Sequence, residues 1–166
     1  EVTSLSFSLA SYRRWDPTAP ALYEVETELL EGSRKIDTIR ESVGFTRKEW
    51  IDGRFFLNGH RMHLTAVMLP GVFAYLGYQA PYALAVEDIT RVRKLSCFDA
   101  VIASGPCFTE EIFEKCDQEG VLCLTDEVRY GNHACAVVLE GVELRRLLHK
   151  ARMEYDENPA VALGRR

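Results

Sequence analysis

Two neighbouring carboxylic acids are the side chains best placed for chemistry in this sequence. Asp126 and Glu127 follow the apolar run 121–124 after one intervening residue, and that run has the composition of a buried strand. Ligand sites in α/β folds commonly form at the carboxyl ends of parallel strands. The pair therefore predicts a site for a polar ligand, with Glu127 the stronger candidate. The alternative is that both carboxylates only cap the helix that follows.

A group of aromatic residues forms the second candidate ligand surface. Aromatic faces stack on apolar C–H surfaces, including those of sugar rings, so these side chains could hold such a ligand. The alternative is that they pack in the core or in a lid over it. They lie in a stretch without charged residues and are Phe73, Tyr75, Tyr78 and Tyr82, of which we take Tyr75 and Tyr78 as substrate-binding candidates.

Other familiar chemistries lack the residue patterns that they need. Ser104 lacks the Gly-x-Ser-x-Gly turn of a serine hydrolase, and no cysteine is placed by sequence beside an activating base. Glycine-rich phosphate loops are missing, so we expect no nucleotide cofactor. The histidines show no metal-ligand spacing, so we expect ordinary polar positions and no metal site. They are His60, His63, His133 and His149.

Composition and charge narrow the function further. The chain has 166 residues, of which 47% are hydrophobic and 27% charged, as in a soluble globular domain. Its formal charge of -5 leaves no basic excess for a phosphate backbone, so we expect no nucleic-acid partner. Five cysteines, an odd number without a Cys-x-x-Cys pair, indicate a reducing compartment, and we expect a cytoplasmic protein.

One uncharged stretch is long enough to cross a bilayer. Residues 64–86 carry no charged side chain. Pro70, Gly71, Gly77 and Pro81 interrupt this stretch, and such helix breakers favour a loop over a membrane helix. The first residues show neither the basic region nor the apolar run of a signal peptide. We therefore expect no membrane partner.

The first third of the chain shows the period-two pattern of half-buried strands. Apolar side chains alternate with glutamates between residues 23 and 29. Gly32 marks a turn, and residues 36–43 can return as the partner strand. Too few strands are present here to close a core. The pattern predicts the end of an antiparallel sheet or sandwich.

After a boundary near residues 46–50, the pattern changes. Asn58-Gly59 predicts the type I′ turn of a hairpin. From there strands and helices alternate, which predicts a parallel sheet of about three or four βα units, roughly half of an eight-unit barrel. The predicted elements are a helix at 86–95, a strand at 99–103, a helix between Thr109 and Gly120, a strand at 121–124, a helix at 144–151 and a last strand at 160–163.

Seven short motifs follow one another along nearly the whole chain: Trp15-Asp16-Pro17, Pro20-x-Leu22-Tyr23, Asp37, Gly44-Phe45, Phe55-x-Leu57-Asn58-Gly59, Cys116-Asp117-x-x-Gly120 and Asp126-Glu127. Their order and spacing resemble glycoside hydrolase family 2, which includes β-galactosidases, β-glucuronidases and β-mannosidases. The resemblance implies that residues 1–47 are the last strands of an immunoglobulin-like β-sandwich. Residues 48–166 would be the first part, about three βα units, of a catalytic (β/α)₈ TIM barrel.

The resemblance also implies a reaction. Family members hydrolyse terminal β-linked sugars with two carboxylates about 5 Å apart, one as acid/base and one as nucleophile. The family's acid/base follows a segment that is similar to residues 158–161, so here it would lie just beyond Arg166. We therefore assign no catalytic residue and expect the chain alone to be inactive, with a carbohydrate as the parent enzyme's substrate. The substrate-binding candidates are Asp126, Glu127, Tyr75 and Tyr78.

Two residues and one segment depart from the family pattern. Thr46 and Thr65 stand where the family usually has arginines, and residues 101–104 offer no cation after the second barrel strand. These losses keep a second hypothesis open, a non-catalytic carbohydrate-binding or interaction module derived from such an enzyme. A third is an unrelated small α/β domain in which the motifs occur by chance. Because an incomplete barrel leaves sheet edges uncovered, we also expect self-association.

Overall fold

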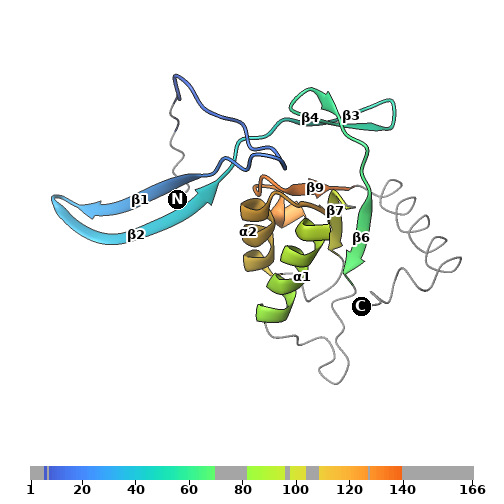
Figure 1. Ribbon diagram of the computed structural model, residues 1–166. Coiled ribbons are helices and arrows are strands. Elements are labelled where there is room, and N and C mark those ends of the chain that lie inside the picture. The colour runs from blue at the N-terminus through green and yellow to red at the C-terminus, as the bar shows by residue number, and fades with distance from the viewer. Residues whose placement is uncertain are drawn as a thin grey trace, which may run out of the picture.

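The computed structural model describes residue 6 and residues 8–69, 82–95, 98–103, 109–126 and 128–139. Three sheets follow one another along this part of the chain, with two, three and four strands. The first sheet projects away from the other elements, which lie together (Figure 1). The chain described here is therefore a strand-rich structure with two helices beside its largest sheet.

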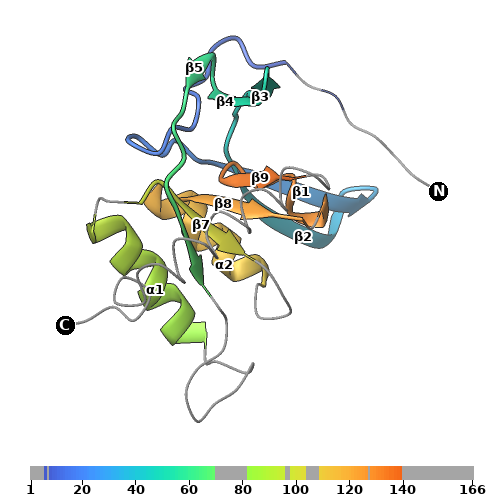
Figure 2. The same cartoon turned by 90° about the vertical axis from the view of Figure 1, so that its right-hand side faces the viewer.

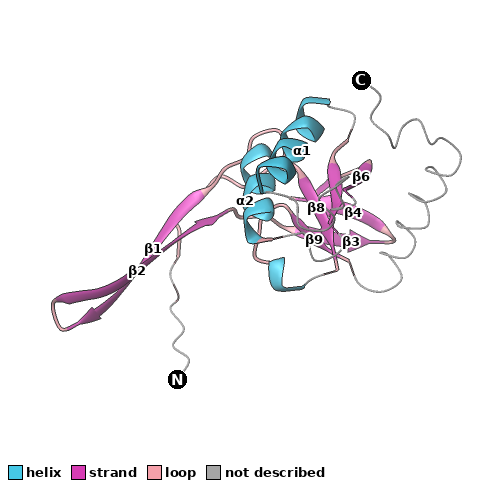
Figure 3. Ribbon diagram, turned by 90° about the horizontal axis from the view of Figure 1, so that it is seen from below, coloured by secondary structure: helices cyan, strands magenta, loops and turns pink. Residues whose placement is uncertain are grey.

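The two-stranded sheet is a long antiparallel hairpin. β1 (Tyr23–Glu31) pairs with β2 (Arg34–Val43), and Gly32 forms the turn with a φ of 63°. The predicted strands are confirmed, but their half-buried character is wrong over most of the hairpin. The hairpin extends away from the other described elements, so no second layer covers its apolar face (Figure 3).

The three-stranded sheet is antiparallel and begins at residue 48. It contains β3 (Lys48–Ile51), β4 (Arg54–Leu57) and β5 (His60–Arg61). Asn58 and Gly59 join the last two strands with φ values of 55° and 86°, as the predicted type I′ turn requires. This sheet lies over the end at which the next strand begins (Figure 2).

The four-stranded sheet is parallel, and its strands follow the order of the sequence. Two helices lie on one face of it (Figures 1 and 3). The predicted alternation of strands and helices is therefore confirmed up to residue 125. The elements are β6 (Ala66–Leu69), α1 (Tyr82–Leu95), β7 (Ala100–Ala103), α2 (Glu110–Glu119), β8 (Leu122–Thr125) and β9 (Ala136–Val138).

The fourth parallel strand corrects the predicted order of elements. The sequence pattern places a helix at 144–151 directly after the strand that ends near residue 125. The structure instead places β9 beside β8, reached through the 3₁₀ helix η1 (Val128–Tyr130). A strand of three residues is too short to show periodicity, which explains the omission. The elements predicted at 144–151 and 160–163 lie outside the described residues.

The core lies between the parallel sheet and its helices, and every residue of β7 and β8 is buried. Gly120 ends α2 with a φ of 72°, and a Cβ there would meet the Pro17 carbonyl oxygen. Trp15 is fully buried, and its Nε1 donates a hydrogen bond to the Asp117 carbonyl oxygen at 2.7 Å. The segment from Trp15 to Pro17 therefore lies against the end of α2.

The uncharged stretch at 64–86 is only partly described. Its ends form β6 and the first residues of α1, and residues 70–81 lie outside the described part. Among the helices of the described ranges, none combines the length and the apolar character that a membrane crossing needs.

Candidate functional site

The four parallel strands end in one row. The register pairs Leu69 with Ala103, Ala103 with Thr125, and Thr125 with Val138. Because the strands are parallel, the segments that follow them leave from the same edge, where ligand sites of α/β folds form. The three-stranded sheet lies over the opposite end (Figure 2). A ligand site is therefore expected at the carboxyl edge of the parallel sheet.

Asp126 is the predicted site residue that the structure describes. It is exposed and directly follows the buried Thr125, the last residue of β8. The strand end is held from the side of β9, because the Leu139 N–H donates to the Thr125 carbonyl oxygen at 2.8 Å. The Asp126 side chain thus lies at the carboxyl edge in contact with solvent, and its role in binding stays a prediction.

The other predicted site residues lie outside the described part of the chain. These are Glu127, Tyr75 and Tyr78, together with Phe73. Tyr82 is the first residue of α1. The structure therefore places one member of the predicted set and leaves the proximity of the acidic pair and the aromatic group as a prediction.

A buried polar group that the sequence did not predict lies between α2 and the segment before β9. The Oδ1 atom of Asp117 accepts a hydrogen bond from the Cys135 N–H at 2.6 Å, and its Oδ2 atom lies 2.8 Å from His133 Nδ1. The other ring nitrogen, Nε2, lies 2.8 Å from Glu110 Oε1. We call Glu110, Asp117 and His133 the carboxylate–histidine cluster.

His133 is not the ordinary polar position that the sequence suggested. Its exposed fraction is 7%, and its ring lies beside the stacked rings of Phe113 and Tyr130. Burial acts to lower the pKa of His133, but the hydrogen bonds with Asp117 and Glu110 outweigh it, and the pKa is raised from 6.5. The two carboxylates therefore favour the charged form of His133.

The sequence held one signal for this cluster. Glu110 and Asp117 are seven residues apart on a predicted helix, which places them on one face, two turns apart. That spacing could have suggested a shared partner for two carboxylates. Nothing local pointed to His133, because its partners lie 16 and 23 residues away in the chain.

Lys48 connects the same region to the three-stranded sheet. Its Nζ atom donates hydrogen bonds to the carbonyl oxygens of His133 at 2.8 Å and Ala136 at 2.6 Å. Burial lowers the pKa of Lys48 from its usual value. Because two carbonyl oxygens hold the amine, β3 is fixed against the segment that enters β9.

Three free cysteines lie beside the cluster and are buried: Cys116, Cys123 and Cys135. A hydrogen bond with Cys123 raises the pKa of Cys116, and burial raises the pKa values of Cys123 and Cys135. Because the thiolate is the reactive form, these environments disfavour cysteine nucleophiles. Cys97 and Cys107 lie outside the described residues.

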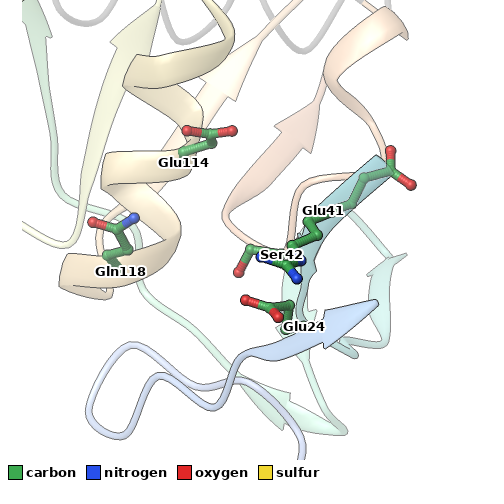
Figure 4. Close-up of a pocket in the computed structure, with 6 residues that line it drawn as sticks. Glu24, Glu41, Ser42, Glu114 and Gln118 are labelled. Atoms are coloured by element: carbon green, nitrogen blue, oxygen red, sulfur yellow. The ribbon is translucent and has the colours of Figure 1, made fainter. Parts of the chain in front are cut away.

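A polar cavity of about 240 Å³ lies between the β1–β2 hairpin and α2. Figure 4 shows Glu114 and Gln118 on α2 opposite Glu24 and Ser42 on the hairpin. The cavity lies on the hairpin side of α2 rather than at the carboxyl edge, and no aromatic ring lines it. Within the described ranges, no group of His, Cys, Asp and Glu side chains suits a metal ion. The lining residues are Glu24, Arg40, Glu41, Ser42, Glu114 and Gln118.

The chain is similar in sequence to known glycosidases. A family model described as glycosyl hydrolases family 2 matches residues 1–45. The β-galactosidase of Leuconostoc mesenteroides subsp. mesenteroides is 27% identical over 130 residues, which cover 78% of this chain and 12% of that protein. The chain spans 12% to 13% of the length of the relatives that it matches.

Solved structures share the fold. A β-glucuronidase from Ruminococcus gnavus in complex with D-glucuronic acid matches with a TM-score of 0.69 and 17% identity, over 87% of this chain and 31% of that one. The Bifidobacterium dentium β-glucuronidase complexed with coumarin-3-O-glucuronide matches with a TM-score of 0.66 and 21% identity, over 87% and 29%. The sequence matches confirm the family resemblance carried by the motifs, and the solved structures show the shared fold.

Proposed function

We propose that this chain, as a relative of the family 2 glycosyl hydrolases, is a segment of a glycosidase that acts on terminal β-linked sugars. The observation that carries the proposal is the carboxyl edge of the parallel sheet, where Asp126 follows a buried strand and is exposed. Ligands of barrel enzymes bind at this edge. The sugars in the two neighbouring structures support a carbohydrate as the ligand class.

Within this proposal, residues 1–47 are the last strands of an immunoglobulin-like sandwich and residues 48–166 the first part of a TIM barrel. Two observations support the division. The proposed boundary falls between β2 and β3, which belong to different sheets. The apolar face of the hairpin is also what a sandwich would bury against a second sheet.

The proposed site combines a carboxylate pair with an aromatic surface. Asp126 and Glu127 would accept hydrogen bonds from sugar hydroxyls, and Tyr75 and Tyr78 would stack on the C–H face of the ring. We assign neither carboxylate a catalytic role. A retaining glycosidase needs two carboxylates about 5 Å apart, and we propose that later segments of the parent enzyme supply them, so that this chain binds sugar without hydrolysing it.

Binding and turnover by the 166-residue chain test the proposal together. We expect weak binding of D-glucuronic acid or D-galactose in NMR titrations, and no release of p-nitrophenol from the matching β-glycosides. Asp126→Asn and Glu127→Gln should each weaken binding about tenfold, because each removes a charged hydrogen-bond acceptor.

The control is Asp52→Asn. Asp52 lies in the exposed β3–β4 turn, and Asn tolerates its φ of 51°. It should leave binding unchanged. Unchanged binding in both site variants would refute the site, and failure of both sugars to bind would refute the carbohydrate-binding role. Turnover that Glu127→Gln abolishes would show that the chain is itself catalytic.

The second candidate function is a non-catalytic carbohydrate-binding or interaction module. The observation in its favour is that β7, the second strand of the parallel sheet, ends in the buried and apolar Ala103, whereas the family usually carries a cation soon after this strand. Such a site would lack the cation for a sugar carboxylate. Sugar binding without hydrolysis by the full protein that contains this segment would favour the module over the glycosidase.

A further inference from the structure

The geometry of the carboxylate–histidine cluster determines the protonation of its histidine. Nδ1 of His133 lies 2.8 Å from a carboxylate oxygen of Asp117, and Nε2 lies 2.8 Å from one of Glu110. A neutral imidazole carries a single N–H donor, whereas the imidazolium carries two. With both carboxylates ionised, the two contacts can therefore exist together only when His133 is charged.

The cluster joins two segments that leave the carboxyl edge of the sheet. Glu110 is the first residue of α2, which follows β7. His133 lies between η1 and β9, on the connection that leaves β8, and Asp126 is the first residue of that connection. The contact between Nε2 and Glu110 therefore ties the start of α2 to the connection that bears the proposed sugar-binding residue.

We propose that His133 is a proton-dependent latch, which ties the first turn of α2 to the β8–β9 connection and so positions Asp126 at the carboxyl edge. The sugar-related part rests on the proposed function, whereas the latch itself does not. Loss of the proton removes the Nε2 donor. Asp117 keeps its contacts with Nδ1 and with the Cys135 N–H, because it is buried. Glu110, whose side chain is 55% exposed, is then released to water.

The groups that face His133 favour the closed latch in acid. On α2 these are the carboxylates of Glu110 and Asp117, and on β3 the amine of Lys48, which bonds the His133 backbone carbonyl oxygen. The neighbouring Cys135 thiol has a raised pKa and is neutral. Because the pKa of His133 is raised from 6.5, its stabilising contribution is complete below 6.5 and is lost as pH rises through the folded-state value.

Hydrogen exchange of the backbone amides at 128–139 measures the latch, once intrinsic exchange rates are corrected for pH. Protection in the unmodified chain should fall about tenfold between about pH 5.5 and pH 8.5. His133→Gln should show low protection at both values, since a single amide cannot contact both carboxylates. Glu110→Gln should stay protected at both, because its amide can accept from the charged ring or donate to the neutral one.

The matched control is His60→Gln on β5, where the histidine is exposed. It should keep the pH profile of the unmodified chain. If the amide protection of either His133→Gln or Glu110→Gln falls with pH as much as that of the unmodified chain, the latch is overturned. If His133→Gln does not fold, Glu110→Gln decides the question alone, because Glu110 lies at the surface.

Titration with D-galactose, a neutral sugar, separates the latch from the proposed function. Binding by the unmodified chain should weaken in parallel with the loss of protection, and binding by Glu110→Gln should not change with pH. If the amide protection changes with pH but the affinity for D-galactose does not, the proposed positioning of Asp126 is overturned. If neither D-galactose nor D-glucuronic acid binds, the proposed function and the positioning role fail together, while the exchange profiles still decide whether the latch exists.

Discussion

Apolar side chains are exposed on the β1–β2 hairpin and buried in the layer formed by α2, β7 and β8. On the hairpin, Leu29 is 61% exposed and Ile39 is 56% exposed. In the α2–β8 layer, all residues of β7 and β8 are buried. Pairing of two strands is enough to form the hairpin, but only a second layer of structure removes its apolar face from water. Local sequence pattern therefore specifies strands, and packing partners specify a core.

Charged groups show the same contrast. Arg40 and Glu26 form an ion pair across the exposed hairpin at 2.5 Å, where water competes for both groups. Glu110, His133 and Asp117 form a chain of contacts that reaches into the interior. In the described residues, every buried polar side-chain atom has a hydrogen-bond partner. Removal of a group should consequently cost far more stability in the layer than on the hairpin.

The largest difference is expected for a matched pair of leucines. Leu124→Ala removes a fully buried side chain from β8 and should lower the free energy of unfolding by about 3 to 5 kcal/mol. Leu29→Ala, at an exposed position in β1, should change it by about 0.5 kcal/mol or less. Urea denaturation of both variants measures the difference. Similar losses would mean that the hairpin is covered in solution, as in the predicted self-association, and would remove the contrast.

The parts of the fold that could be predicted from sequence are those encoded by neighbouring residues. Asn58-Gly59 specified a type I′ turn because both residues tolerate positive φ. The bounds of α2 followed from Thr109 and Gly120, although the Thr109 side chain makes no capping hydrogen bond. β9 was missed because its pairing with β8, rather than any pattern in its own three residues, makes it a strand.

The candidate site likewise contains one residue that could be predicted from its neighbours in sequence and one that could not. Asp126 could be predicted because it directly follows β8, whose apolar sequence marks it as a strand. His133 could not, because its partners come from a helix that ends 14 residues earlier, and the chain must fold before they meet. None of the four histidines shows metal-ligand spacing in the sequence, and burial beside two carboxylates is what distinguishes His133 from the exposed His60.

A smaller effect is expected from the matched tryptophans. Trp15→Phe keeps most of a fully buried ring but removes the Nε1 hydrogen bond to the Asp117 carbonyl oxygen. The loss should be about 1 to 2 kcal/mol, since the carbonyl oxygen stays buried without that donor. Trp50→Phe, at a position that is 36% exposed, is the control and should cost less. Chemical denaturation ranks the two, and a larger loss for Trp50→Phe would refute the role assigned to Trp15.

The smallest effect is expected for the hairpin ion pair. A double-mutant cycle with Arg40→Gln and Glu26→Gln should give a coupling of about 0.2 to 1 kcal/mol, which falls in about 1 M salt. The side chains are 65% and 36% exposed, so water screens the pair and the coupling stays weak. A coupling above about 2 kcal/mol would be typical of a desolvated pair. If it also grew with protein concentration, association of chains would be burying the hairpin, and the exposed and buried regions would differ only in the isolated chain.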